Sequence, residues 1–170
     1  AMVGALSDPF DDCHMGITAE NVAKRWQVSR EDQDALAVES HKRAAAAIDA
    51  GRFKEQILPI EVKVKGGTAF FDTDENVRRD VSIEKMAKLR PVFDKSGTVT
   101  AGNASSINDA AAAVVLMDAA AAEKGGFKPM ARLVGYAHAG LEPKIMGLGP
   151  VPATQNVLKK TGLKLEQIDV

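Results

Sequence analysis

The sequence is poor in cysteine, in net charge and in long apolar runs, and each scarcity excludes a class of protein. A lone cysteine, Cys13, cannot form an internal disulfide or cage a metal by itself. A formal net charge of −1 gives no field that would attract nucleic acid or an anionic membrane. No apolar run approaches the ~20 residues of a transmembrane helix, and the N-terminus lacks the layout of a secretion signal. We therefore expect a cytoplasmic protein without a structural metal, a nucleic-acid partner or a membrane partner.

What is present is the composition of an ordinary globular protein. The 170 residues are 45% hydrophobic and 26% charged, which disfavours disorder. A chain of this length is one sizeable domain or a piece of a larger one. Because the net charge is close to zero, an anionic ligand has to be met by a local cluster of lysine and arginine side chains.

Helix signals are clearest early in the chain. Ser29 followed by Asp32 has the spacing of a hydroxyl that caps a backbone N–H and an acidic residue that reaches back. Apolar residues at helical spacing follow, and Gly51 is a natural end. A second helix start is expected at Thr18, and a short helix is expected over residues 82–89.

Strand signals come next along the chain. Apolar and charged residues alternate over residues 60–65, which predicts a half-buried strand. Gly66 and Gly67 then turn the chain toward residues 69–71, so a hairpin is expected. Residues 73–97 are dense in charge and are predicted to lie on the surface.

The second half contains a segment with two open interpretations. Residues 110–117 combine alanines, which favour a helix, with an apolar run that fits a strand buried on both faces. Asp118 is placed to cap a helix that ends at Gly125. Four further elements are expected: a strand over residues 131–137, a rigid loop over 146–153, a helix that Pro152 opens and Gly162 closes, and the start of a strand at 168–170.

Three segments resemble corresponding segments of one enzyme family. They are HMGITAENVA at residues 14–23, GTVTAGNASSINDAAAAVV at 97–115 and MGLGPVPA at 146–153. Each is similar to a segment of the thiolases, the acetyl-CoA acetyltransferases and 3-ketoacyl-CoA thiolases, and most similar to the bacterial biosynthetic type. The resemblance extends over essentially the whole chain. Ordered motifs at matching intervals are more specific than any single glycine-rich turn.

The resemblance implies an α/β fold, the thiolase-like layered fold that is αβαβα in the full enzyme, with this chain as a central fragment. Residues 1–107 would form the inserted α+β loop domain with the pantetheine-binding segment. Residues 108–128 would be the last strand and helix of the N-terminal half, and 129–170 the start of the C-terminal half. The family's two catalytic cysteines and GHP histidine match no residue here, so no residue of this chain is expected to be catalytic.

The activity implied for the full protein is that of an acetyl-CoA C-acyltransferase, in which two short-chain acyl-CoAs undergo reversible Claisen condensation or thiolysis. Coenzyme A thioesters would be its substrates, with no permanently bound cofactor. A homodimer or homotetramer is expected for the full-length protein. From the residues alone, two other classes stay open: a non-catalytic acyl-CoA-binding module and an oligomer-assembly element.

The resemblance also implies a surface that binds coenzyme A. Ser105 would bond the pantetheine arm and Ala101 would line its tunnel, because buried amides need polar partners and small residues permit close approach. His14 and Met15 would border the acyl end, and Arg78 would lie beside the nucleotide. The remaining implied positions are Leu6 and Phe93, against the adenine or pantetheine side, and Met146, near the reacting acyl group.

Several of these residues also have plain interpretations. Cys13 and His14 are neighbours, but adjacent side chains on an extended chain point to opposite faces, so Cys13 is expected to be passive. His41 is expected to be solvated on a charged helix face, and His138 to be a core or boundary residue. The basic cluster around Arg78 is balanced by nearby carboxylates, which is typical of a solvated face.

Overall fold

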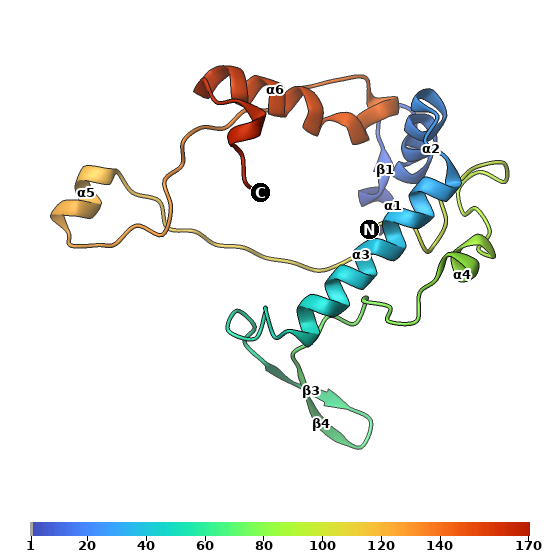
Figure 1. Cartoon of the computed structure of the whole chain (residues 1–170), viewed down its shortest axis with the longest axis horizontal. Helices are drawn as coiled ribbons and strands as arrows, with labels where there is room; N and C mark the ends of the chain where they lie inside the picture. Colours follow the sequence, from blue (N-terminus) through green and yellow to red (C-terminus); the bar gives the residue numbers. More distant parts are fainter. Residues whose placement is uncertain (1) are drawn as a thin grey trace. The chain divides into compact units, whose positions relative to one another are not determined.

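The computed structural model describes residues 2–170, with the side chains from residue 4 onward. The chain forms two compact units, Ala1–Ser106 and Ile107–Val170. The first unit contains α1 (Met2–Ala5), β1 (Ser7–Asp8), β2 (Cys13–His14), α2 (Met15–Trp26), α3 (Arg30–Asp49), β3 (Ile60–Val64), β4 (Gly67–Phe71) and α4 (Ile83–Ala87) (Figure 1). The second contains α5 (Ala119–Lys124), the 3-10 helices η1 (Pro143–Leu148) and η2 (Leu165–Gln167), and α6 (Pro150–Thr161).

The start of α2 differs from its prediction. The helix begins at Met15, and its N-cap is His14, whose Nδ1 accepts a hydrogen bond from the Gly16 backbone N–H at 2.9 Å. Thr18 lies inside the first turn, where its hydroxyl donates to the Met15 carbonyl oxygen at 2.7 Å. Histidine is not one of the side chains that usually cap helices, which is why the hydroxyl of Thr18 was the stronger signal.

The predicted long helix is confirmed as α3. Ser29 is its N-cap: the hydroxyl oxygen accepts from the Asp32 N–H at 3.0 Å and the hydroxyl donates to the Asp32 carboxylate at 2.6 Å. Gly51 follows the helix with φ +66°, a conformation that a residue without Cβ adopts freely. The helix buries Asp34 and Val38, and it packs against α4, which buries Met86. The short helix expected over residues 82–89 is present as α4, and Ser82 is its N-cap.

The predicted hairpin is confirmed, but its predicted half-burial is wrong. β3 and β4 pair antiparallel with Ile60 opposite Phe71 and Val64 opposite Gly67. Every residue of both strands is exposed, because no other element covers either face within the first unit. The hairpin projects beyond the last turn of α3 (Figure 1). The alternation of apolar and charged residues thus predicted the strand, but it did not predict whether another element would cover it.

The second unit has one predicted helix at each end of a long extended stretch. Asp118 caps α5 through the N–H groups of Ala120 and Ala121, and the helix ends at Gly125, as predicted. The last helix, α6, begins at Pro150 instead of Pro152 and ends at Gly162 with φ +73°. The loop prediction for residues 146–153 is wrong, since the 3-10 helix η1 runs into α6 there.

The remaining segments of the second unit are extended but unpaired. Residues 110–117 form neither the helix nor the strand left open by the sequence, and Val115 is 91% exposed. Residues 131–137 and 168–170 likewise carry no strand pairing. A strand needs a neighbour to accept and donate its backbone hydrogen bonds, and this unit offers none.

Few side chains are buried among residues 4–170. In the first unit the apolar core consists of Ala23, Val38, Met86 and Val99, with Thr18 and Thr100 fully enclosed beside it. In the second unit Ala122 is buried. Over residues 2–170, no helix is long and apolar enough to cross a membrane.

Candidate coenzyme-binding site

The first cluster of predicted site residues forms where β2 runs into α2. The Met15 N–H donates to the Leu6 carbonyl oxygen at 2.8 Å, which places Leu6 beside the first turn of α2. The pairing of Ser7 with His14 in the β1–β2 hairpin fixes this approach. Both Leu6 and Met15 are half-buried, so part of each apolar side chain is available to a ligand.

Phe93 completes this cluster by stacking on His14. The two rings lie 4.5 Å apart between centroids at an interplanar angle of 22°. Gly16 permits the stack, because a Cβ at that position would lie 2.2 Å from a Phe93 ring carbon. Since Nδ1 of His14 is the acceptor for the Gly16 N–H, the proton of the neutral ring is on Nε2. His14 therefore presents Nε2–H as a hydrogen-bond donor.

The loop that carries Phe93 is closed at its base. The Val92 N–H donates to the Val99 carbonyl oxygen at 3.0 Å, and Pro91 forms a β-bridge with Thr100. Glu20 on α2 holds the returning limb, since its carboxylate accepts from the Thr98 N–H at 2.9 Å and the Val99 N–H at 2.7 Å. The segment that follows, with Ala101 and Ser105, is thereby attached to α2.

A second set of contacts attaches the same segment to α3. The Asn103 amide donates to the Asp34 carboxylate and to the Thr98 carbonyl oxygen, both at 3.0 Å, and its oxygen accepts from the Thr100 N–H at 2.7 Å. The Gln33 amide donates to the Thr98 hydroxyl oxygen at 2.9 Å. The turn over residues 100–105 is therefore fixed by side chains from two helices.

This turn and α3 line an open hollow of about 340 Å³. From α3 it is lined by Gln33, Leu36, Ala37, Ser40 and His41, and from the turn by Gly102, Asn103, Ala104 and Ser105. Ser105 is exposed, and its hydroxyl donates locally to the Ser106 carbonyl oxygen at 3.3 Å. His14 and Met15 do not line this hollow. A single binding slot formed by Ser105 together with His14 and Met15 therefore remains a prediction.

Arg78 reaches the same side of α3 through its backbone. Its N–H donates to Nδ1 of His41 at 3.1 Å. His41 is half-buried, and its hydrogen bond with Arg78 lies at an exposed position. The sequence did not single out His41 or Gln33 as site residues, because neither belongs to a recognisable motif. Their position on one helix face, four residues either side of Ala37, is the signal that was available.

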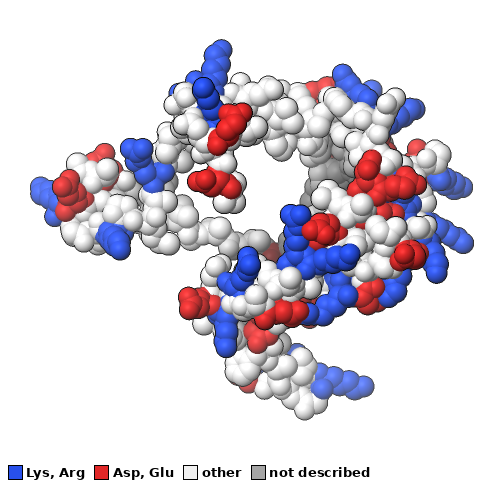
Figure 2. Space-filling view, viewed as in Figure 1, with Lys and Arg blue, Asp and Glu red and all other residues white. Residues whose placement is uncertain are grey.

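Two other cations of the basic cluster are occupied by carboxylates. Arg79 pairs with Asp49 at 2.8 Å, and the hydrogen bond from the guanidinium lowers the pKa of Asp49 while it raises that of Arg79. Lys85 pairs with Asp80 at 2.7 Å, which lowers the pKa of Asp80. Positive and negative side chains are interspersed over this unit (Figure 2). The predicted solvated face is thus present, and the exposed Arg78 guanidinium stays the candidate for a nucleotide.

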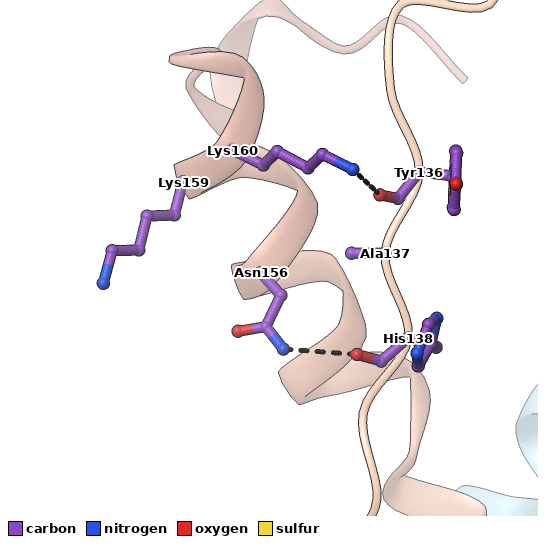
Figure 3. Close-up of a pocket in the computed structure, with 6 residues that line it drawn as sticks. All are labelled: Tyr136, Ala137, His138, Asn156, Lys159 and Lys160. Carbon is purple, nitrogen blue, oxygen red and sulfur yellow. Dashed lines mark hydrogen bonds between the residues drawn. The ribbon is translucent and has the colours of Figure 1, made fainter.

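The second unit carries Met146 and a separate hollow. Met146 lies in η1 and its residue is 43% exposed. The hollow, of about 630 Å³, lies between α6 and an extended segment, and it is lined by Tyr136, Ala137, His138, Asn156, Lys159 and Lys160 (Figure 3). Lys160 donates to the Tyr136 carbonyl oxygen at 3.2 Å, and Asn156 donates to that of His138 at 3.4 Å. These contacts hold the segment on α6.

No group of three or more His, Cys, Asp or Glu side chains within the described part of the chain could hold a metal ion. Of the eight predicted site residues, Leu6, His14, Met15 and Phe93 gather at one corner of the first unit. Ser105 and the Arg78 backbone lie along α3, and Ala101 precedes the turn that carries Ser105. Met146 belongs to the other unit.

The sequence was compared with known families and proteins. Residues 1–120 match the family described as "Thiolase, N-terminal domain" and residues 127–170 match "Thiolase, C-terminal domain". A similar curated protein is the beta-ketothiolase BktB of Cupriavidus necator, with 61% identity over 170 residues, which is 99% of this chain and 43% of that protein.

Solved structures give the same result. The acetyl-CoA acetyltransferase of Bacillus anthracis matches with a TM-score of 0.92 and 45% identity, over 99% of this chain and 43% of that one. The human mitochondrial 3-ketoacyl-CoA thiolase in complex with CoA matches with a TM-score of 0.87 and 41% identity, over 99% and 42%. The chain spans less than half the length of these relatives. Its fold is that of the corresponding part of the α/β thiolase fold, and the chain belongs to the thiolase family.

Proposed function

We propose that the chain forms the coenzyme A-binding part of an acetyl-CoA C-acyltransferase. The reaction of the whole protein is reversible Claisen condensation or thiolysis between two short-chain acyl-CoAs, which are substrates; no cofactor stays bound. Family membership supports the reaction class, and relatives include acetyl-CoA acetyltransferases and a thiolase solved with CoA. The division into a loop domain over residues 1–107, a strand and helix over 108–128 and the start of a second half over 129–170 belongs to the same proposal.

The observation that carries the proposal is the hollow between α3 and the turn at residues 102–105. The pantetheine arm is narrow and contains amides, which need polar partners when they leave water. Ser105 offers a hydroxyl beside small residues, and the Gln33 amide lies on the facing helix. His41 connects this hollow to Arg78, whose exposed guanidinium suits the nucleotide end of the same ligand.

The corner formed by Leu6, His14, Met15 and Phe93 is proposed for the acyl end. Its half-buried apolar side chains provide a flexible wall, and the His14 Nε2–H provides a donor for a thioester oxygen or a water molecule. Met146 is assigned to the same end by its motif. A short acyl group is proposed because residues 14–23 and 97–115 are most similar to the bacterial biosynthetic type.

The chain by itself is proposed to carry out no turnover. Thiolase chemistry needs a thiolate nucleophile that is acylated and a base that activates it. Cys13 is a free, half-buried thiol in β2, and it matches neither of the family's catalytic cysteines. CoA-dependent cleavage of acetoacetyl-CoA by this chain alone would contradict the assignment. A free thiol also fits a reducing compartment such as the cytoplasm.

Calorimetric titration of the 170-residue chain with CoA tests the binding assignment. The unchanged chain should bind, and Ser105→Trp should abolish binding by filling the hollow. Ser106→Trp is the matched control, because Ser106 is exposed in the same segment but does not line the hollow. Equal affinity of Ser105→Trp and the unchanged chain would refute the proposal, as would the absence of binding to the folded, unchanged chain.

A second role, assembly of a dimer or tetramer, is favoured by the hairpin. The register places Ile60, Val62 and Val64 on one face with Ala69 and Phe71, and this apolar face is exposed. Exposed apolar faces and free strand edges promote association. We expect light scattering to show self-association that Val62→Lys reduces, whereas Lys63→Ala on the opposite face leaves it unchanged. A monodisperse, unchanged monomer would contradict this role.

A further inference from the structure

The turn that presents Ser105 is held by a buried polar chain that starts on α3, at Arg30 and Asp34. We propose that Asn103 is a positioning residue that, held by the buried Asp34, fixes the backbone of residues 100–105 and so sets the Ser105 side of the hollow. The consequence for CoA affinity rests on the proposed function, whereas the fixing of the backbone does not.

Asp34 is the anchor of this chain of contacts. Asp34 is 3% exposed, and its carboxylate accepts hydrogen bonds from Arg30 Nε at 2.7 Å and from the Asn103 amide at 3.0 Å. Arg30 is itself fixed, since its other nitrogen donates to the carbonyl oxygens of Met86 at 2.7 Å and Leu89 at 3.0 Å. A buried carboxylate with two donors in fixed directions leaves little freedom to the group that it binds.

Asn103 needs both halves of its amide. The nitrogen donates to Asp34 and to the Thr98 carbonyl oxygen, and the oxygen accepts from the Thr100 N–H. Thr100 has 0% exposure, so its N–H has no water as a substitute acceptor. Aspartate would supply the acceptor but would set a second carboxylate against Asp34. Alanine would supply neither half.

The effect of this arrangement reaches Ser105 through the backbone. The Ala104 N–H donates to the Thr100 carbonyl oxygen at 3.0 Å, and the Gly102 N–H to the Thr100 hydroxyl oxygen at 3.2 Å. Gly102 has no room for a side chain, because a Cβ there would lie 2.5 Å from a Leu89 methyl carbon. Fixing Thr100 therefore restricts the backbone conformation of residues 101–104, which lead to Ser105.

An exchange of partners tests the pair directly. The variants are Asn103→Asp, Asp34→Asn and the double variant, with Asn156→Ala as a control that removes an exposed amide from the second unit. In the double variant the amide at position 34 can donate to the carboxylate at 103, while its oxygen still accepts from Arg30. Residue-resolved amide exchange at Thr100 and Ala104 is measured together with CoA affinity.

Each single variant should speed amide exchange at Thr100 and Ala104 about tenfold or more, the factor expected when a buried hydrogen bond is lost. The double variant should recover part of the protection, because the carboxylate at 103 regains a donor at position 34 but no longer donates to the Thr98 carbonyl oxygen. Amides in the middle of α3 should change little. The dissociation constant for CoA should rise and recover in parallel. A merely structural role would speed amide exchange without changing the dissociation constant for CoA.

Equal exchange at Thr100 in Asn103→Asp and Asn156→Ala would overturn the inference, and so would no recovery in the double variant. Faster exchange without any change in CoA affinity would show that the turn is fixed but does not position the ligand, and this too would overturn it. If the unchanged chain binds no CoA, the proposed function fails, and the pattern of amide exchange alone decides whether Asn103 fixes the turn.

Discussion

Glu20 should contribute a large share of the stability of the first unit. Its carboxylate, on α2, accepts from the Thr98 N–H through both oxygens, from the Thr98 hydroxyl at 3.0 Å and from the Val99 N–H at 2.7 Å. Gly97 packs against the same carboxylate so closely that a Cβ there would lie 2.2 Å from an oxygen. Glu20→Ala would remove every one of these acceptors at once.

The size of the expected loss in stability follows from the hydrogen-bond donors that Glu20→Ala leaves without an acceptor. A hydrogen bond to a charged group contributes about 1.5–3 kcal/mol, and a buried donor without a partner costs about 1–3 kcal/mol. Val99 is 7% exposed, so its N–H stays buried, whereas half-exposed Thr98 can turn to water. We therefore expect Glu20→Ala to lower the free energy of unfolding by about 2–4 kcal/mol. Glu20→Gln keeps one acceptor oxygen and should cost about half as much.

The assay uses the single tryptophan, Trp26, which lies at the end of the same helix and reports on this unit alone. With a urea slope of about 2 kcal/mol per molar, the unfolding midpoint should fall by about 1–2 M for Glu20→Ala. Glu55→Ala, at an exposed turn position, is the matched control. If Glu20→Ala and Glu55→Ala unfold at the same midpoint, the attachment of the loop to α2 contributes nothing and the reasoning is refuted.

Three further outcomes can be measured. Gly16→Ala should destabilise the first unit by about 1–3 kcal/mol in urea unfolding, because the added carbon overlaps the Phe93 ring, and Phe93→Ala in the same chain should remove most of that loss. The pairing of Asp49 with Arg79 lowers the carboxyl pKa below its ordinary value of 3.8, so its stabilising effect is present at neutral pH and is lost as the pH falls through the lowered pKa. In an NMR titration, Arg79→Gln should move the Asp49 midpoint upward; an unmoved midpoint would show that the pair does not form. Gly162→Ala should shorten α6 and reduce helical circular dichroism, at a cost of about 1 kcal/mol, since φ is +73° there; equal spectra would contradict this.

Local sequence signals predicted the parts of the fold that local chemistry decides. Ser29 and Asp118 cap helices in the structure as predicted, because a side chain and the N–H groups it caps are two or three residues apart. The start of α2 was missed because an imidazole replaces the usual hydroxyl or carboxylate at His14. When an unusual side chain caps a helix, the sequence does not reveal the cap, although the structure has the usual capping geometry.

Features that depend on distant partners were not predictable in the same way. The alternation at residues 60–64 fixed the pairing but gave no sign that both faces would be exposed. For residues 110–117, pairing depends on a neighbour that local sequence does not specify. In the site, the turn at Ser105 was predicted from a motif, whereas Gln33 and His41 were not, because they reach it from α3 across more than sixty residues of sequence.

The loop that carries Phe93 has a consequence for how this chain can change in length. Its two limbs are joined at Val92 and Val99, and one limb leads to the His14 ring while the other leads to the turn at Ser105. An insertion between those limbs would shift both regions at once. An insertion at the tip of the β3–β4 hairpin, beside Gly66, would shift neither. Length variants of this protein that keep their ligand should therefore accumulate at the hairpin tip, and the Phe93 loop should keep a constant number of residues.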